Sequence, residues 1–115
     1  MIVQIKKQNI LLVPDMYYIG HCVSCDKAMG AGLAKTLRQT YPGIINGSLI
    51  HPNIGDVEIV GRIINIYTKS RYFHKPTYQN FTLAIHSLVS ACLSNNIKYL
   101  AIPKLGCGLD RLNWD

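Results

Sequence analysis

The sequence predicts an α/β domain in which helices cover a mixed β-sheet. Short segments rich in β-branched and aromatic residues recur along the chain, two segments repeat apolar residues at helical spacing, and the two kinds alternate. The chain has 115 residues, of which 49% are hydrophobic and 16% are charged. This length suits one core that needs no disulfide or metal, and the composition excludes a disordered chain. We therefore expect residues 1–115 to form a single domain.

The first half of the chain predicts strands followed by one helix. Residues 2–5 and 10–13 are short β-rich runs, and residues 17–23 (YYIGHCV) predict a core strand. Apolar residues then recur at helical spacing over 29–41, where a Pro-Gly pair ends the predicted helix. Residues 43–55 predict a long, turn-rich connection.

The second half repeats this alternation. Residues 57–60 and 62–68 predict a hairpin or two successive strands, followed by a basic, aromatic loop. A helix is expected over 76–94, with Pro in its first turn, and residues 98–103 predict a strand. Residues 105–109 (LGCGL) form a tight glycine loop. An α/β layer normally continues beyond such a loop, so we expect either a naturally minimal domain or a segment of a longer one.

The charge and hydropathy of the sequence limit the kinds of binding partner and the cellular location that we expect. A formal net charge of +6 favours anionic partners, either nucleic acid or a phosphorylated small molecule. However, the chain has no long run of basic residues of the kind that marks a nucleic-acid-binding arm. Its apolar runs are far shorter than the roughly 18 residues of a membrane span, and its start does not resemble a signal peptide. We expect a monomer without a membrane partner, in the cytoplasm or, in a eukaryote, the nucleus.

The cysteines and histidines predict neither a metal nor a cofactor. Cys22 and Cys25 form a CVSC motif, but a second pair of ligands for zinc is missing, and a redox pair usually encloses Pro or Gly. We expect these thiols, with Cys92 and Cys107, to be reduced and buried. His21 lies in a predicted core strand and is expected to be a hydrogen-bonded structural residue.

Two glycine pairs follow predicted strands, at 30–32 (GAG) and 106–108 (GCG). Ligands of open α/β sheets bind beyond the carboxyl ends of strands, and glycine lets the backbone approach a phosphate closely. Neither pair matches the dinucleotide-binding fingerprint or the P-loop. The pairs are therefore either tight turns or the two halves of a clamp on a diphosphate.

Lys69 and Asp110 are the candidate reactive groups. Lys69 follows a predicted strand close in sequence to Arg71 and Lys75, and nearby cations would favour its neutral, nucleophilic amine. Asp110 follows the second glycine loop, where a carboxylate could move protons at a bound ligand. The ordinary alternatives are a solvated lysine and an aspartate paired with Arg111. The residues alone leave both interpretations open.

Three longer stretches, HCVSCDKAMGAGLA, YTKSRYFHKPTY and IPKLGCGLDRLNW, resemble the macrodomain superfamily. More narrowly, they are similar to its terminal ADP-ribose glycohydrolase branch, with the macrodomain antitoxins that reverse DNA ADP-ribosylation as near relatives. The resemblance extends from about Ile2 to the last residue. It implies a three-layer α/β/α sandwich around a mixed sheet, with ADP-ribose in a cleft at the carboxyl edge of the sheet.

The resemblance also assigns site residues. Lys69 matches the catalytic lysine of the family and Asp110 its catalytic aspartate. The positions that match ADP-ribose-binding residues are Asn9, Ile10, Ser24, Gly30, Gly32, Lys104, Leu105, Gly106, Cys107 and Gly108. The last five belong to the loop that wraps the diphosphate and the distal ribose, and Ile10 matches a backbone contact near the adenine.

Two departures from the family pattern stand out. Asn9 replaces an aspartate that accepts from the adenine amino group, so we expect weaker adenine recognition. The chain also stops before the C-terminal helix and strand that cover the adenine in the family, so the sandwich is expected to lack them.

The resemblance implies removal of mono-ADP-ribose from a modified protein (a glutamate ester), from a nucleobase or from O-acetyl-ADP-ribose. The expected partners are ADP-ribose and ADP-ribosylated protein or nucleic acid, and no cofactor or metal is implied. The alternatives are a reader module that binds ADP-ribose without cleaving it and a phosphatase acting on ADP-ribose 1″-phosphate. The sequence does not distinguish the linkages, because all of them present the same ADP-ribose.

Overall fold

Four strands form one mixed sheet within residues 9–103, the part of the chain that the computed structural model describes. In chain order the elements are η1 (Ile10–Leu12), β1 (Tyr18–Ser24), α1 (Gly32–Thr40), η2 (Pro42–Asn46), β2 (Val57–Val60), β3 (Ile63–Lys69), α2 (Tyr78–Ser94) and β4 (Leu100–Ala101). The strand order across the sheet is β2-β3-β1-β4. β1 is parallel to both β3 and β4, so these three strands end at the same edge.

The sequence allowed either a hairpin or two successive strands after residue 56, and the structure shows an antiparallel hairpin of β2 and β3. Gly61 in the turn has φ +62°, a left-handed conformation that favours glycine. β3 is buried from Ile63 to Thr68, as expected for a central strand covered on both faces.

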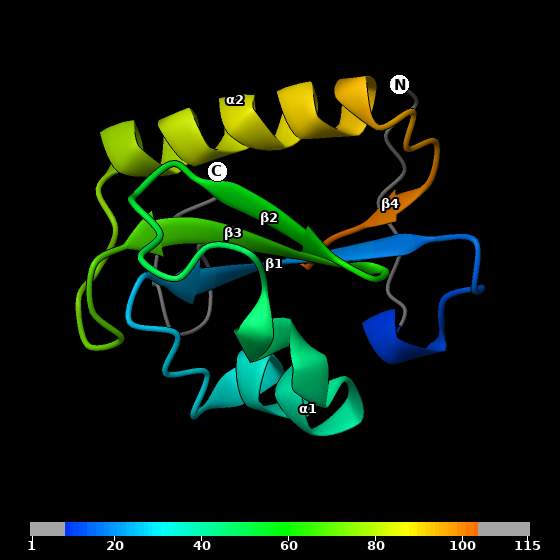
Figure 1. Cartoon of the computed structure of the whole chain (residues 1–115), viewed down its shortest axis with the longest axis horizontal. Helices are drawn as coiled ribbons and strands as arrows, with labels where there is room; N and C mark the ends of the chain where they lie inside the picture. The colour runs from blue at the N-terminus through cyan, green and yellow to red at the C-terminus, as the bar shows by residue number, and fades with distance from the viewer. Residues whose placement is uncertain (1–8, 104–115) are drawn as a thin grey trace.

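The sheet lies between two helical layers. Figure 1 shows α2 across one face and α1 with η2 below the other. On the α1 side the buried apolar core consists of Ile19, Val23, Met29, Leu37, Ile44, Ile63 and Tyr67. On the α2 side it consists of Ile64, Ile66, Ala84, Leu88 and Cys92. Alternate residues of β3 thus supply both cores, and the expected three-layer α/β/α sandwich is confirmed.

α2 matches its prediction except at its start. Thr77 is the N-cap and its side chain accepts a hydrogen bond from the Asn80 N–H at 3.0 Å, so Pro76 lies just before the helix and not in its first turn. At the other end Asn96 has φ +53°, and the Ile97 N–H donates to the carbonyl oxygen of Cys92 at 2.9 Å. This is a Schellman motif, which satisfies the last carbonyls of the helix.

α1 begins later than the apolar pattern predicts. The pattern starts at Met29, but Met29 is left-handed (φ +41°) and Ala31 is extended (φ −150°, ψ 160°), so the helix begins at Gly32. Gly30 consequently lies in the preceding loop and not in the first turn. After α1 the chain forms the 3₁₀ helix η2, which begins at Pro42, where the sequence predicted an irregular connection.

Two predicted strands differ from the structure. Residues 10–13 contain the 3₁₀ helix η1, because the Asn9 side chain caps this turn by accepting from the Leu11 N–H at 3.0 Å. The strand expected over 98–103 is reduced to the two-residue β4, which pairs with Tyr18 and Ile19 of β1. The predicted strand 2–5 and the glycine loop 105–109 lie outside the described residues.

Candidate active site at the carboxyl edge of the sheet

Ser24 and Lys69 end two neighbouring parallel strands and are register partners. The backbone N–H of Cys25 donates to the carbonyl oxygen of Lys69 at 2.8 Å, which holds the two strand ends together. Ser24 is buried and Lys69 is half-buried. The structure therefore brings the candidate catalytic lysine beside the first predicted ligand loop, although 45 positions separate the two residues in the sequence.

A β-bulge lies directly before Lys69. The register passes from Val23 opposite Tyr67 to Ser24 opposite Lys69, so Thr68 has no partner in β1. Such an extra residue bends its strand and redirects the side chain that follows it. The Thr68 side chain is fully buried. The bulge therefore fixes the direction in which Lys69 leaves the sheet.

Asp26 links the two loops at this edge. Its carboxylate accepts from the Ser24 hydroxyl, from the Ala28 N–H at 3.1 Å and from the Tyr72 N–H at 2.9 Å. Burial tends to raise the pKa of Asp26, but these hydrogen bonds and the charge of Arg71 outweigh it, so the pKa is lowered and the carboxylate is ionised at neutral pH. The loop after β1 is thereby tied to the loop after β3.

No role at the site can be assigned to Asp26 from the sequence alone, where an aspartate after a predicted strand suggests a cap for the next helix. The N-cap of α1 is instead Ala31, whose side chain makes no cap hydrogen bond. The local feature that could have suggested this role is an Asx turn, in which the Asp side chain accepts a hydrogen bond from the backbone N–H two residues ahead. Tyr72, another hydrogen-bond partner of Asp26, lies 46 residues away, so nothing near Asp26 in the sequence indicates this contact.

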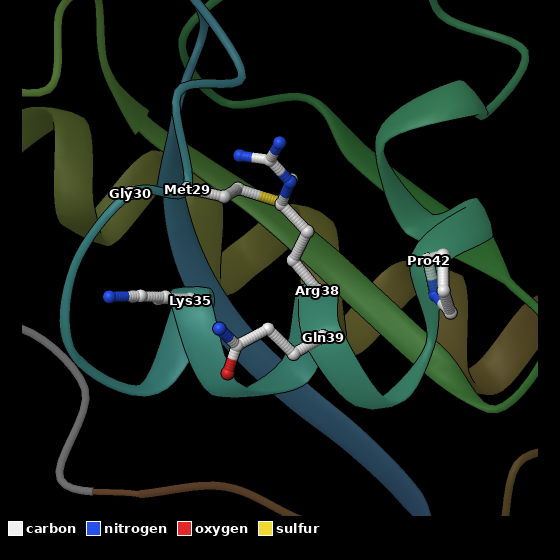
Figure 2. Close-up of a pocket in the computed structure, with 6 residues that line it drawn as sticks. All are labelled: Met29, Gly30, Lys35, Arg38, Gln39 and Pro42. Atoms are coloured by element: carbon white, nitrogen blue, oxygen red, sulfur yellow. The ribbon is translucent and has the colours of Figure 1, made fainter.

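Gly30 lines an open depression of about 440 Å³ on the outer side of α1. Figure 2 shows Met29 and Gly30 coming from the loop, while Lys35, Arg38 and Gln39 extend from α1 and Pro42 closes the far side. Arg38 donates to the carbonyl oxygen of Ala28 at 3.3 Å. Two cations and an amide beside an open glycine suit an anionic group. Gly32 follows as the first residue of α1, with φ +60°.

His21 is a core residue, as expected. It is buried on the α1 side of β1, and its Nε2 lies 2.7 Å from the Asn65 side-chain oxygen. Because the Asn65 amide nitrogen donates to the Ile44 carbonyl oxygen at 2.9 Å, its oxygen faces His21, and Nε2 is the donor. Burial lowers the pKa of His21 to about 4, against a smaller opposing effect of this hydrogen bond. The imidazole is therefore neutral at physiological pH.

The other predicted site residues lie either in the turn before β1 or outside the described residues. Asn9 and Ile10 belong to the η1 turn, which Figure 1 shows beside the amino-terminal part of β1. The side-chain carbonyl oxygen of Asn9 accepts from the Leu11 N–H. Asp110 and the loop residues Lys104, Leu105, Gly106, Cys107 and Gly108 lie outside the described residues.

Neither a metal-binding cluster nor a membrane-spanning helix is found within residues 9–103. No group of three or more His, Cys, Asp or Glu side chains there could hold a metal ion. No helix in the same range is both long and apolar enough to cross a membrane. Cys25 and Cys92 are free thiols. Cys92 is buried on the side of α2 that packs against the sheet, whereas Cys25 is half-buried and not buried as expected.

The fold is that of a macrodomain. The macrodomain of Mycobacterium tuberculosis DarG superposes with a TM-score of 0.84 over 95% of this chain and 80% of that one, at 22% identity. The Thermosipho africanus DarTG protein, solved in complex with ADP-ribose, superposes with a TM-score of 0.72 over 87% of this chain and 32% of that one, at 19% identity. At these identities the likeness establishes the fold alone.

The sequence comparison is more specific. No protein-family model matches the chain. The ADP-ribose glycohydrolase OARD1 of Homo sapiens is 34% identical over 113 residues, which cover 95% of this chain and 74% of the relative. The chain therefore belongs to the terminal ADP-ribose glycohydrolase branch of the macrodomain family.

Proposed function

We propose that this protein is an ADP-ribosyl glycohydrolase, which binds ADP-ribose and releases it from a mono-ADP-ribosylated macromolecule. The relationship to the glycohydrolase OARD1 supports this proposal. The observation that carries it is the pairing of Lys69 with Ser24 at the carboxyl edge of a macrodomain sheet. A lysine, whose neutral amine can act as a nucleophile, thereby lies next to the proposed ligand-binding loop, at the edge where α/β sheets bind ligands.

The diphosphate is proposed to lie between two glycine loops, at 30–32 and 104–108. Open backbone at Gly30 supports the first half of this clamp, since among residues 9–103 a Cβ there would meet the Ala28 carbonyl oxygen alone, at 3.8 Å. The positive charge of Lys35 and Arg38 beside Gly30, and the net charge of +6, favour a diphosphate. Asn9 and Ile10 are proposed to contact the adenine.

Lys69 is proposed to act as the nucleophile. Its neutral amine attacks the anomeric carbon of the distal ribose, a latent aldehyde, and forms a carbon–nitrogen bond while the bond to the modified group breaks. The leaving oxygen or nitrogen takes a proton. Water then hydrolyses the lysyl adduct, which regenerates the amine and releases free ADP-ribose. One difficult displacement is thus divided into two easier steps.

Asp110 is proposed to carry the proton between these steps. As a carboxylate it accepts the proton that the lysine ammonium must lose, and it then donates this proton to the leaving group. In the second step it accepts a proton from the attacking water. No metal or cofactor has a part in this scheme.

The protein is further proposed to act as one domain over residues 1–115, as a monomer in the cytoplasm. Free thiols at Cys25 and Cys92 suit a reducing compartment. Light scattering after size-exclusion chromatography tests the monomer, and fluorescence imaging of a tagged chain tests the location.

The function is tested with three substrates: a protein carrying ADP-ribose on glutamate, an ADP-ribosylated nucleobase in DNA, and O-acetyl-ADP-ribose. We expect ADP-ribose to bind at one-to-one stoichiometry in calorimetry and free ADP-ribose to be released from at least one substrate. Binding without release would identify a reader module. Release of inorganic phosphate from ADP-ribose 1″-phosphate, with the three substrates intact, would identify a phosphatase.

A further inference from the structure

Lys27 fastens the first ligand loop to the interior of the protein. Its side chain is 15% exposed, and its ammonium donates to the carbonyl oxygens of Leu49 and, at 3.4 Å, of Ile45. The same ammonium lies 3.9 Å from a carboxylate oxygen of Glu58. A lysine at the surface of a loop is usually solvated, whereas this one reaches inward to three acceptors in other elements.

Glu58 is a rigid acceptor for this contact. Its carboxylate is buried and accepts from the Tyr67 hydroxyl at 2.8 Å, the Asn65 amide at 3.3 Å and the Leu49 N–H at 2.7 Å. A Cβ at Gly47 would overlap this carboxylate, so the chain passes close to it. Donors from the sheet and from the segment after η2 therefore hold Glu58 in one place.

The loop that Lys27 fastens has a strained backbone. Lys27 (φ +56°) and Met29 (φ +41°) both occupy the left-handed region, which costs free energy for residues other than glycine. Such conformations persist where the surroundings over-determine them. Asp26 holds the loop toward Tyr72 of the loop after β3, and Lys27 holds it toward Leu49 and Glu58. Adjacent side chains thus pin the loop in two directions.

We propose that Lys27 is a positioning residue for ADP-ribose, which keeps the 25–31 loop in its binding conformation without contacting the ligand. This inference rests on the proposed function, because the loop must be the one that receives the diphosphate. A preformed loop loses little entropy on binding, whereas a released loop must be ordered by the ligand. Lys69 belongs to β3 and keeps its place when the loop is released. Loss of Lys27 should therefore weaken binding and leave the chemical step intact.

The experiment compares the parent with Lys27→Met, with Lys27→Arg, which keeps a cationic donor, and with Lys98→Met. Lys98 is an exposed lysine in the connection between α2 and β4, so it is the matched control. For Lys27→Met we expect the Kd for ADP-ribose and the KM to rise at least about fivefold, with kcat within about twofold of the parent. Lys27→Arg should recover most of the affinity, and Lys98→Met should match the parent. An unchanged Kd in Lys27→Met, or a fall in kcat at constant KM, would overturn the proposal.

Amide hydrogen exchange separates this inference from the proposed function. Residues 25–31 should exchange at least about tenfold faster in Lys27→Met than in the parent and in Lys98→Met, while α2 stays equally protected. Unchanged exchange in this loop overturns the positioning role even when the parent binds ADP-ribose. Absence of ADP-ribose binding by the parent overturns the proposed function itself. If Lys27→Met does not fold, Lys27→Arg and Lys27→Gln decide the question by the same comparison.

Discussion

His21 makes the stability of this protein depend on pH within a defined range. Burial lowers its pKa to about 4 from an ordinary value of 6.5, because the imidazolium would lose its hydration between the sheet and α1. Between about pH 4 and pH 6.5 the unfolded chain binds a proton at this histidine and the folded chain does not. The contribution of the neutral His21 ring to the free energy of unfolding is therefore fully present above about pH 6.5. It is lost as the pH falls toward 4.

The size of this effect follows from the difference between 6.5 and about 4. It corresponds to about 3 kcal/mol in total, of which about 2.5 kcal/mol is lost between pH 7.5 and pH 4.5. The pKa of Asp26 is lowered from 3.8, so this carboxyl titrates below the range and does not obscure the result. The loss is large beside the roughly 5–15 kcal/mol by which a domain is stable.

The assay is urea unfolding followed by circular dichroism at pH 7.5 and pH 4.5. The parent is compared with His21→Gln and with His51→Gln, which changes an exposed histidine. The free energy of unfolding of the parent and of His51→Gln should fall by about 2.5 kcal/mol more than that of His21→Gln over this range. An equal fall in all three proteins would refute the assignment of a buried, neutral imidazole at this position.

Four further substitutions test other parts of the account. Gly47→Ala should lower the free energy of unfolding by about 1–3 kcal/mol in urea, because its Cβ overlaps the Glu58 carboxylate. Gly43→Ala, whose Cβ has no atom of the described part of the chain within 4 Å, should change it by under about 0.5 kcal/mol, and equal effects would contradict the packing. Gly108→Val should abolish ADP-ribose binding in calorimetry with little change in Tm, whereas parent-like binding would make that loop an ordinary turn. Asp26→Ala should raise the Kd for ADP-ribose about tenfold, since three donors lose their acceptor, and an unchanged Kd would remove Asp26 from the site.

Elements governed by local chemistry could be predicted from the sequence. The β-branched run of β3 and the apolar face of α2 specify their own conformations, and the Asn95–Asn96 pair marks the helix end because asparagine tolerates a left-handed backbone. The short run at 10–13 was predicted wrongly for the complementary reason. Its β propensity is weaker than the side-chain cap that Asn9 provides, so a 3₁₀ turn forms.

Features that depend on distant contacts could not be predicted in this way. The start of α1 is delayed by left-handed residues that Asp26 and Lys27 stabilise through partners 18–46 residues away. The proximity of Ser24 and Lys69 depends on parallel pairing of two strands that are separated by a helix and a hairpin strand. Lys69 could be nominated as a reactive group from the sequence, but its neighbours become visible only in the folded sheet.

Release of ADP-ribose by the Lys69 variants tests the central claim most directly. Lys69→Ala should bind ADP-ribose like the parent and lose its release from the substrate that the parent hydrolyses. Lys69→Arg should be equally inactive, because a guanidinium stays protonated and cannot attack carbon. In Asp110→Ala, intact-mass spectrometry should detect an ADP-ribosyl adduct that disappears when Lys69 is also replaced. Full release of ADP-ribose by Lys69→Ala would contradict the covalent mechanism.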